Sequence, residues 1–126
     1  MDATKARELF ARGQSIWYDN MSRALLKDGT IENLIQSGAI YGITTNPAIF
    51  AKALPASVYD PSIAELATKG FDTRQIYDAL TVYDVRKACD MFRQLYERTG
   101  YADGYVSLEV NPDLAHDTEG TIRDVK

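Results

Sequence analysis

The stretch Ile-Tyr-Gly-Ile-Thr-Thr-Asn-Pro-Ala-Ile-Phe, residues 40–50, joins a short apolar run directly to a helix start. Residues 40–45 predict a buried strand because they are rich in apolar and β-branched side chains. Asn46 followed by Pro47 predicts a helix, since Asn is a favoured cap and Pro at the first helical position loses only an N–H that would be unpaired anyway. A strand that passes straight into a helix is the building unit of an α/β fold.

Two further apolar runs predict strands on either side of this one. Residues 15–18, Ser-Ile-Trp-Tyr, predict a first strand that ends at Asp19, and residues 105–110, Tyr-Val-Ser-Leu-Glu-Val, predict a third. Helices are predicted at residues 22–27, 30–37 (with Thr30 as its cap), 61–69, 72–100 and 117–126, and Thr81 to Asp84 fits a capping box that restarts the fourth of them. A long helical excursion therefore separates the second and third strands.

Strands that alternate with helices are expected to pair in parallel through right-handed crossovers. The predicted class is α/β, with residues 1–126 forming one segment of a single domain. Three strands cannot close a barrel, and both outer strands would present unpaired backbone groups. The sequence therefore predicts an incomplete sheet that needs further strands.

Composition excludes several classes of function. The chain has 14 Lys and Arg against 18 Asp and Glu, a net charge of −4, which opposes binding to a nucleic acid backbone. One cysteine, Cys89, and one histidine, His116, are too few for a zinc site or a Cys/His dyad, and a lone cysteine suits the cytoplasm. No apolar run is long enough to predict a membrane span or a signal peptide.

Polar side chains follow or end each predicted strand. Asp19 follows the first, and Glu109 lies near the end of the third, between Leu108 and Val110. The second ends in the polar cluster Thr44, Thr45 and Asn46. In parallel α/β folds ligands bind at this end of the strands, so these side chains are expected to face one site. Glu109 is expected to have polar neighbours, because an unpartnered buried carboxylate is costly.

Other roles for the same residues remain open on sequence alone. Asp19 and Asn46 could simply cap the helices that follow them, and Glu109 could pair with an Arg or Lys in a structural network. Asp19 and Glu109 could also be ligands of Mg²⁺ in a different barrel enzyme, since hard cations prefer carboxylate oxygen.

Three stretches resemble the N-terminal part of the transaldolases. They are Ser-Ile-Trp-Tyr-Asp-Asn-Met-Ser-Arg (15–23), Gly-Ile-Thr-Thr-Asn-Pro-Ala-Ile-Phe (42–50) and Val-Ser-Leu-Glu-Val-Asn-Pro (106–112), followed by Ala-His-Asp-Thr-Glu (115–119). The match runs in order along nearly the whole chain. The resemblance implies a TIM (β/α)8 barrel, of which this chain would supply about the first three strands.

The resemblance also implies an activity. Transaldolases move a dihydroxyacetone unit from sedoheptulose 7-phosphate to glyceraldehyde 3-phosphate, giving erythrose 4-phosphate and fructose 6-phosphate in the pentose phosphate pathway. A lysine forms a Schiff base with the substrate, without metal or organic cofactor. By position, Asp19 resembles the proton-exchanging aspartate, Glu109 the glutamate that assists dehydration through water, and Asn46 the amide that orients substrate hydroxyls. Thr45 is expected to bind substrate together with Asn46.

The chain departs from the family pattern in one respect. The Schiff-base lysine of transaldolases stands on the fourth strand, beyond the helix that Lys126 only begins, so the isolated chain is expected to be inactive. The lysines here fall on predicted helices or their flanks and are Lys5, Lys27, Lys52, Lys69, Lys87 and Lys126. An alternative is a non-catalytic half-barrel partner that assembles with a complementary chain or with itself through its unpaired edges.

Overall fold

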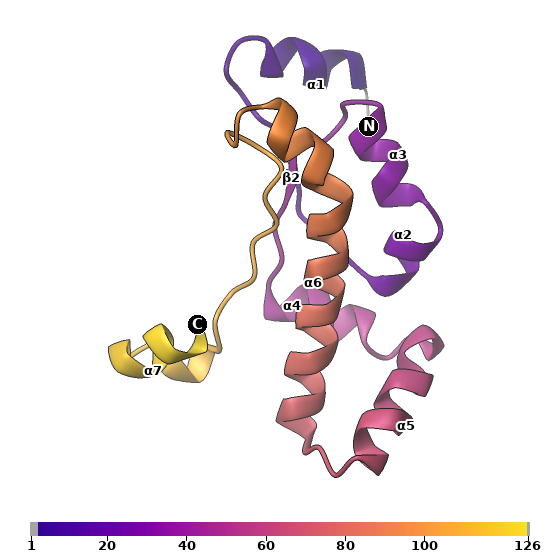
Figure 1. The fold of residues 1–126 in the computed structure, drawn as a ribbon, viewed down its shortest axis with the longest axis vertical. Helices are drawn as coiled ribbons and strands as arrows, with labels where there is room; N and C mark the ends of the chain where they lie inside the picture. Colours follow the sequence, from indigo (N-terminus) through magenta and orange to yellow (C-terminus); the bar gives the residue numbers. More distant parts are fainter. Residues whose placement is uncertain (1–2, 126) are drawn as a thin grey trace.

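A computed structural model describes residues 3–125 as a single layer of extended segments with helices packed mainly on one side. In chain order the elements are α1 (Ala3–Phe10), β1 (Trp17–Tyr18), α2 (Arg23–Lys27), α3 (Thr30–Gln36), β2 (Gly42–Ile43), α4 (Pro47–Ala53), η1 (Ser57–Tyr59), α5 (Asp60–Thr68), α6 (Thr73–Arg98), η2 (Pro112–Leu114) and α7 (Thr118–Asp124). Figure 1 shows α6 running along the length of the molecule, with α1 near one end and α5 near the other.

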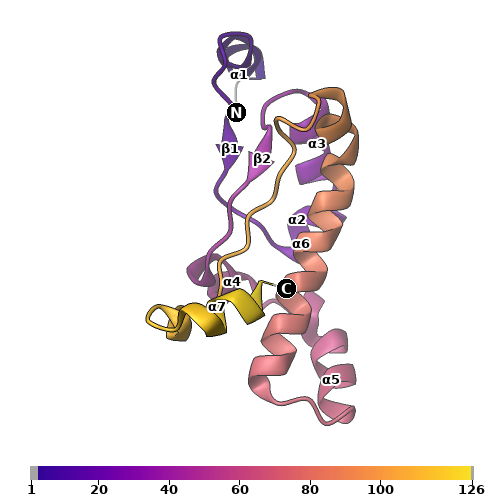
Figure 2. The ribbon, with the colours of Figure 1, turned by 60° about the vertical axis from the view of Figure 1, so that its left-hand side comes forward.

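The extended segments pair in parallel, as the sequence predicts. β1 pairs with β2, with Trp17 opposite Gly42, and Ile43 forms a parallel bridge with Val106. The Ile43 N–H donates to the Tyr105 carbonyl over 3.0 Å, and its own carbonyl accepts from the Ser107 N–H over 2.9 Å. Figure 2 shows β1, β2 and the segment that includes Val106 side by side.

The regular strands are shorter than predicted. β1 and β2 cover two residues each, in place of 15–18 and 40–45. The third predicted strand, 105–110, is wrong as a strand, because only Val106 bridges to β2. Beyond Ser107 the segment leaves β2 and continues into η2. A strand pattern in the sequence does not by itself supply a partner for each backbone group.

The predicted restart of a helix at Thr81 is also wrong. α6 runs without a break from Thr73 to Arg98, and its capping box is at Asp72 and Gln75. The Thr81 hydroxyl donates to the carbonyls of Tyr77 and Asp78, which lets a threonine remain inside a helix.

Two other helices differ from the sequence interpretation. The structure has a helix, α1, where none was predicted, and its last residue Phe10 stacks on Tyr41 with ring centroids 3.9 Å apart. α3 is preceded by Gly29 in the left-handed conformation, with φ of 82°, so the predicted cap Thr30 is instead its first residue. α7 ends at Asp124, and Lys126 lies outside the described residues.

The hydrophobic core lies between the strand layer and the helices α2, α3 and α6, which lie on one side of that layer (Figure 2). Ile43 of β2 and Phe92 of α6 are both fully buried in it. The full cluster is Met21, Leu26, Ile31, Ile40, Tyr41, Ile43, Phe50, Ala88, Phe92 and Leu95. Burying these apolar faces is the main force that holds such short strands in place.

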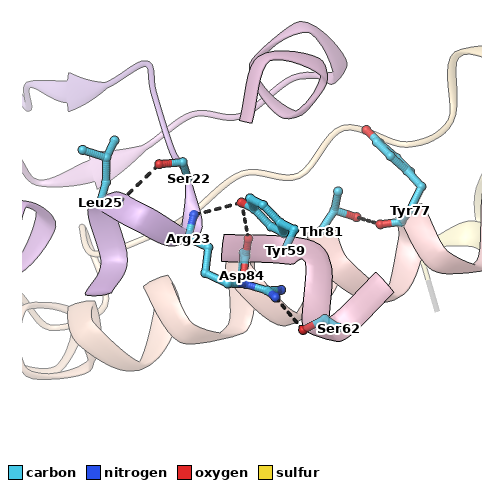
Figure 3. Close-up of polar contacts among 8 residues, drawn as sticks. All are labelled: Ser22, Arg23, Leu25, Tyr59, Ser62, Tyr77, Thr81 and Asp84. Carbon is cyan, nitrogen blue, oxygen red and sulfur yellow. Dashed lines mark hydrogen bonds and ion pairs between the residues drawn. The ribbon is translucent and has the colours of Figure 1, made fainter. Parts of the chain in front are cut away.

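A buried polar cluster, which we call the Arg23 clamp, links α2 to η1, α5 and α6 (Figure 3). Its members are Arg23, Tyr59, Ser62 and Asp84. The Arg23 guanidinium donates through Nε to Asp84 Oδ1 over 2.9 Å and through Nη1 to Ser62 Oγ over 2.8 Å. The Tyr59 hydroxyl accepts from the Arg23 backbone N–H over 2.9 Å and donates to Asp84 Oδ2 over 2.8 Å. Asp84, the other end of the predicted capping box, is thus a buried ion-pair partner.

Gly42→Ala is expected to lower the free energy of unfolding by about 1–3 kcal/mol, the usual cost of overpacking. A Cβ at Gly42 would lie 2.5 Å from Cδ2 and Cε2 of the Trp17 ring on β1. Urea unfolding measures the change. Trp17→Phe in the same chain serves as the control, and the double variant should lose less than the sum of the single variants. An unchanged free energy for Gly42→Ala would contradict this close approach.

The Arg23 clamp predicts a loss of stability at high pH. Burial, as the largest effect, raises the pKa of Tyr59 from 10.0 to about 12. Between these two values the unfolded chain has lost a proton that the folded chain retains, so the contribution is complete below pH 10.0 and is lost as pH rises to about 12. The difference in unfolding free energy between the native chain and Tyr59→Phe should therefore shrink across this window. A constant difference would show that the hydroxyl is not protected from titration.

Candidate functional site

Side-chain hydrogen bonds join the ends of the three paired segments. The Thr44 hydroxyl, just after β2, donates to Asp19 Oδ1, just after β1, over 2.7 Å. The Asp19 side chain is otherwise exposed, and the residue that caps α2 is Ser22, which accepts from the Leu25 N–H. The interpretation of Asp19 as a helix cap is therefore wrong, and its carboxylate instead points toward the neighbouring segment.

Thr45 makes the second link between segments. It is buried, and its hydroxyl donates to the Ser107 carbonyl over 2.7 Å. Its backbone N–H donates to Ser107 Oγ over 3.4 Å. Ser107 belongs to the stretch 106–112 that carries the family resemblance, but the sequence predicts no role for it. Only the register of the segment against β2 shows that it lies beside Thr45.

Asn46 is the cap of α4. Its Oδ1 accepts from the Ile49 N–H over 3.0 Å, and Pro47 occupies the first helical turn as predicted. The capping interpretation of Asn46 is therefore confirmed. A cap of this kind uses the amide oxygen and leaves the two N–H donors of the same group for another partner.

Glu109 is exposed, so the expectation of a carboxylate held among polar partners in a buried strand is wrong. It lies beyond the last backbone bond between its segment and β2, in the wall of a hollow of about 390 Å³ that also includes Pro47, Tyr77 and Asn111. Burial, then the charges of Asp78 and Glu109, raise the pKa of Tyr77. The negative charge of Glu109 thus acts on the hydroxyl of Tyr77, which lines the same hollow.

Asp19 lies in a different hollow, of about 580 Å³, together with Asn20, Ser22, Lys52 and Tyr59. Within residues 3–125 no hydrogen bond joins Asp19 to Glu109. The structure therefore brings Asp19 to β2 and Thr45 to the third segment, whereas the two carboxylates line separate hollows.

No metal centre is evident in the part of the chain that the structure describes. No group of three or more His, Cys, Asp or Glu side chains within residues 3–125 could hold a metal ion. The magnesium alternative thus finds no ligand set there. None of the described helices is both long and apolar enough to span a bilayer.

Comparison with known proteins decides the family. A family model described as transaldolase/fructose-6-phosphate aldolase matches residues 16–126. The chain belongs to this family. It is 46% identical over 120 residues to transaldolase 2 of Nostoc sp., which covers 94% of this chain and 32% of that protein. It is 47% identical over 120 residues to the transaldolase of Acidothermus cellulolyticus, with the same coverage of 94% and 32%.

The transaldolase resemblance seen in the sequence is thus confirmed. Transaldolase 2 of Nostoc punctiforme is 41% identical over 127 residues, which cover 100% of this chain and 33% of that protein. The chain therefore spans about a third of the length of the curated relatives it matches. All the predicted site residues, Asp19, Thr45, Asn46 and Glu109, fall within the matched range 16–126.

Thr45→Val is expected to lower the free energy of unfolding by about 0.5–1.5 kcal/mol, because it removes the hydrogen bond from the buried hydroxyl to the Ser107 carbonyl. Thr44→Val is the matched control at the adjacent position. It removes a bond to an exposed carboxylate, so the expected change is only about 0.5 kcal/mol or less. Chemical unfolding of the two variants checks the difference. Equal effects would contradict the assignment of Thr45 as the buried link.

Proposed function

We propose that this chain supplies part of the active-site face of a transaldolase-type (β/α)8 barrel. The observation that supports this most directly is the pair of side-chain links, Thr44 to Asp19 and Thr45 to Ser107, at the ends of three parallel segments. In barrels of this class the reacting groups stand at the carboxyl ends of the strands. The reaction we propose is the transfer of a dihydroxyacetone unit between sugar phosphates by Schiff-base chemistry.

Asp19 is proposed as the residue that exchanges a proton with the hydroxyl at the bond being cleaved. The hydrogen bond from Thr44 is accepted by Oδ1 and orients the carboxylate, and we propose that Oδ2 meets the substrate. A carboxylate held in one orientation by a neighbouring hydroxyl is suited to general acid–base catalysis, because the proton must travel along a defined line.

Glu109 and Asn46 are proposed for the remaining roles. Glu109 assists dehydration of the carbinolamine through water, which an exposed carboxylate can reach. Asn46 offers its amide N–H groups to substrate hydroxyls while its oxygen caps α4. The expectation that Thr45 binds substrate is wrong, because its buried hydroxyl is used by the Ser107 carbonyl. Thr45 acts indirectly, since this bond holds the segment that carries Glu109 against β2.

The Schiff-base lysine is proposed to lie on a strand that this chain does not contain. The described lysines are all exposed, and they are Lys5, Lys27, Lys52, Lys69 and Lys87. None lies on an extended segment of the layer. We therefore propose that the isolated chain is inactive and requires the remaining barrel strands, in a cytoplasmic enzyme of the pentose phosphate pathway.

A non-catalytic half-barrel partner is the second candidate. It is favoured by the exposure of large side chains on the outer segment, where Tyr105 is 45% and Leu108 41% exposed. A segment of this kind with free backbone groups can pair with another chain. Under this candidate the carboxylates carry no catalytic role.

A chimera tests the proposed function. Residues 1–126 would replace the corresponding third of the Acidothermus cellulolyticus transaldolase, which is 47% identical over the shared 120 residues. We expect the chimera to form erythrose 4-phosphate from sedoheptulose 7-phosphate and glyceraldehyde 3-phosphate. Asp19→Asn and Glu109→Gln should each lower kcat by roughly 10²–10⁴-fold, the usual contribution of a positioned acid or base.

Asp90→Asn in the same chimera is the matched control, because Asp90 is exposed on α6 and its ion pair among the described residues is with Arg93. It should leave kcat unchanged. Borohydride should trap a sugar adduct on the chimera and none on the isolated chain. A folded chimera whose Asp19→Asn variant keeps full activity would contradict the proposed role and favour the half-barrel partner. An adduct on the isolated chain would contradict its inactivity.

A further inference from the structure

We propose that Arg23, Tyr59 and Asp84, the buried core of the Arg23 clamp, are positioning residues for Asp19. They act on the segment of residues 19–22, between the end of β1 and the start of α2. The catalytic meaning of Asp19 rests on the proposed function above. The placement of Asp19 by the clamp does not, and it can be measured without substrate.

The clamp holds Arg23 by both its backbone and its side chain. The backbone N–H donates to the Tyr59 hydroxyl, and the guanidinium donates to Asp84 and Ser62 (Figure 3). The guanidinium carbon also lies 4.5 Å from the centre of the Tyr59 ring. The first residue of α2 is therefore fixed from two directions by elements that lie outside the strand layer.

Asp19 is fixed at the other end of the same short segment. Its carboxylate accepts from Thr44 over 2.7 Å, and between the two anchors Met21 is fully buried. Only three residues separate Asp19 from Arg23, and each spans at most about 3.3–3.6 Å, so the two anchors are coupled through a short stretch of backbone. A shift of the Arg23 backbone must therefore be taken up within this segment, and the orientation of Asp19 changes with it.

Tyr59 provides a second connection to Asp19. Both residues line the hollow of about 580 Å³, together with Ser22 and Leu25 at the start of α2. The hydroxyl of Tyr59 thus joins the clamp, while the residue also lines the hollow that includes the proposed catalytic carboxylate. The clamp therefore sets the distance between η1 and α2, the two sides of this hollow.

The chemistry of the clamp suits a positioning role better than a stabilising one. A buried ion pair often adds little net stability, because desolvating two charges offsets their attraction. Its geometric demands are strict, however, since every donor and acceptor needs its partner. Within residues 3–125 no buried side-chain nitrogen or oxygen lacks one. A fully satisfied network of this kind fixes one arrangement of its elements.

Tyr59→Phe in the full chain tests the proposal, because it removes the one hydroxyl that bonds both Arg23 and Asp84. The first readout is the carboxyl ¹³C resonance of Asp19, which should move. Loss of stability alone leaves the resonances of the remaining folded molecules in place. An Asp19 resonance that stays unchanged would overturn the proposal.

A double-mutant cycle gives the second readout. Tyr59→Phe and Thr44→Val act at the two anchors of one segment and share no hydrogen-bond partner. Independent sites change the unfolding free energy additively, so their factors on the unfolding equilibrium constant multiply to within about twofold. We expect the double variant to be destabilised by more than about threefold beyond the combined effects of the single variants, because the segment is released only when both anchors are lost. Additivity would overturn the proposal.

Tyr41→Phe is the matched control. Tyr41 is also buried, but it stacks on Phe10 and lies outside the clamp, so its variant should leave the Asp19 resonance in place. Should Tyr59→Phe not fold, Ser62→Ala removes only the bond to Arg23 Nη1 and is expected to move the Asp19 resonance by a smaller amount. No change with Ser62→Ala would then overturn the proposal. These results are independent of the activity of the chimera.

Discussion

The parallel pairing of β2 with a segment on each side is the constraint on which the rest of the structure depends. Ile43 is fully buried and bonds through both its N–H and its carbonyl to the segment that contains Val106, while β1 lies on the other side. Because the three segments run in the same direction, the residues that follow them meet at one end of the layer. Thr44 then reaches Asp19, and Thr45 reaches Ser107. So few backbone bonds suffice only because the layer rests on an apolar core.

α6 supplies most of that support and also carries the buried acid of the clamp. Phe92 and Leu95 pack against the core in one half of the helix, whereas Asp84 pairs with Arg23 in the other. The helix therefore contacts the layer through apolar burial and the start of α2 through an ion pair. Apolar contacts tolerate small displacements, but a guanidinium that must meet both a carboxylate and a hydroxyl does not. The apolar contacts therefore hold the layer, and the ion pair orients the segment at the start of α2.

Local chemistry made much of this predictable from sequence. Asn46 followed by Pro47 marks the start of α4, Ser22 caps α2, and alternation of strands with helices predicts parallel pairing. The sequence predictions fail where the structure of a segment depends on a partner that is distant in the chain. Thr81 to Asp84 has the pattern of a cap, yet Asp84 is taken by Arg23, 61 residues away in the chain. The alternation at 105–110 suggests a strand, but within residues 3–125 no backbone bond joins residues 108–110 to β2. Family resemblance supplied what spacing could not, namely the role proposed for each polar residue.

The polar residues at the ends of the segments divide by exposure into two kinds, and the division bears on what each can do. Thr45 is buried and its hydroxyl donates to the Ser107 carbonyl, so it stabilises the layer but cannot contact a substrate. Asp19 and Glu109 are exposed, and each retains carboxylate oxygen that no described partner uses. Asn46 stands between these kinds, because capping α4 occupies its oxygen and leaves its N–H donors. The structural bond of Thr45 therefore prevents contact with a substrate. At Asn46 the structural bond uses the amide oxygen, and the N–H groups of the same amide can still bind a substrate.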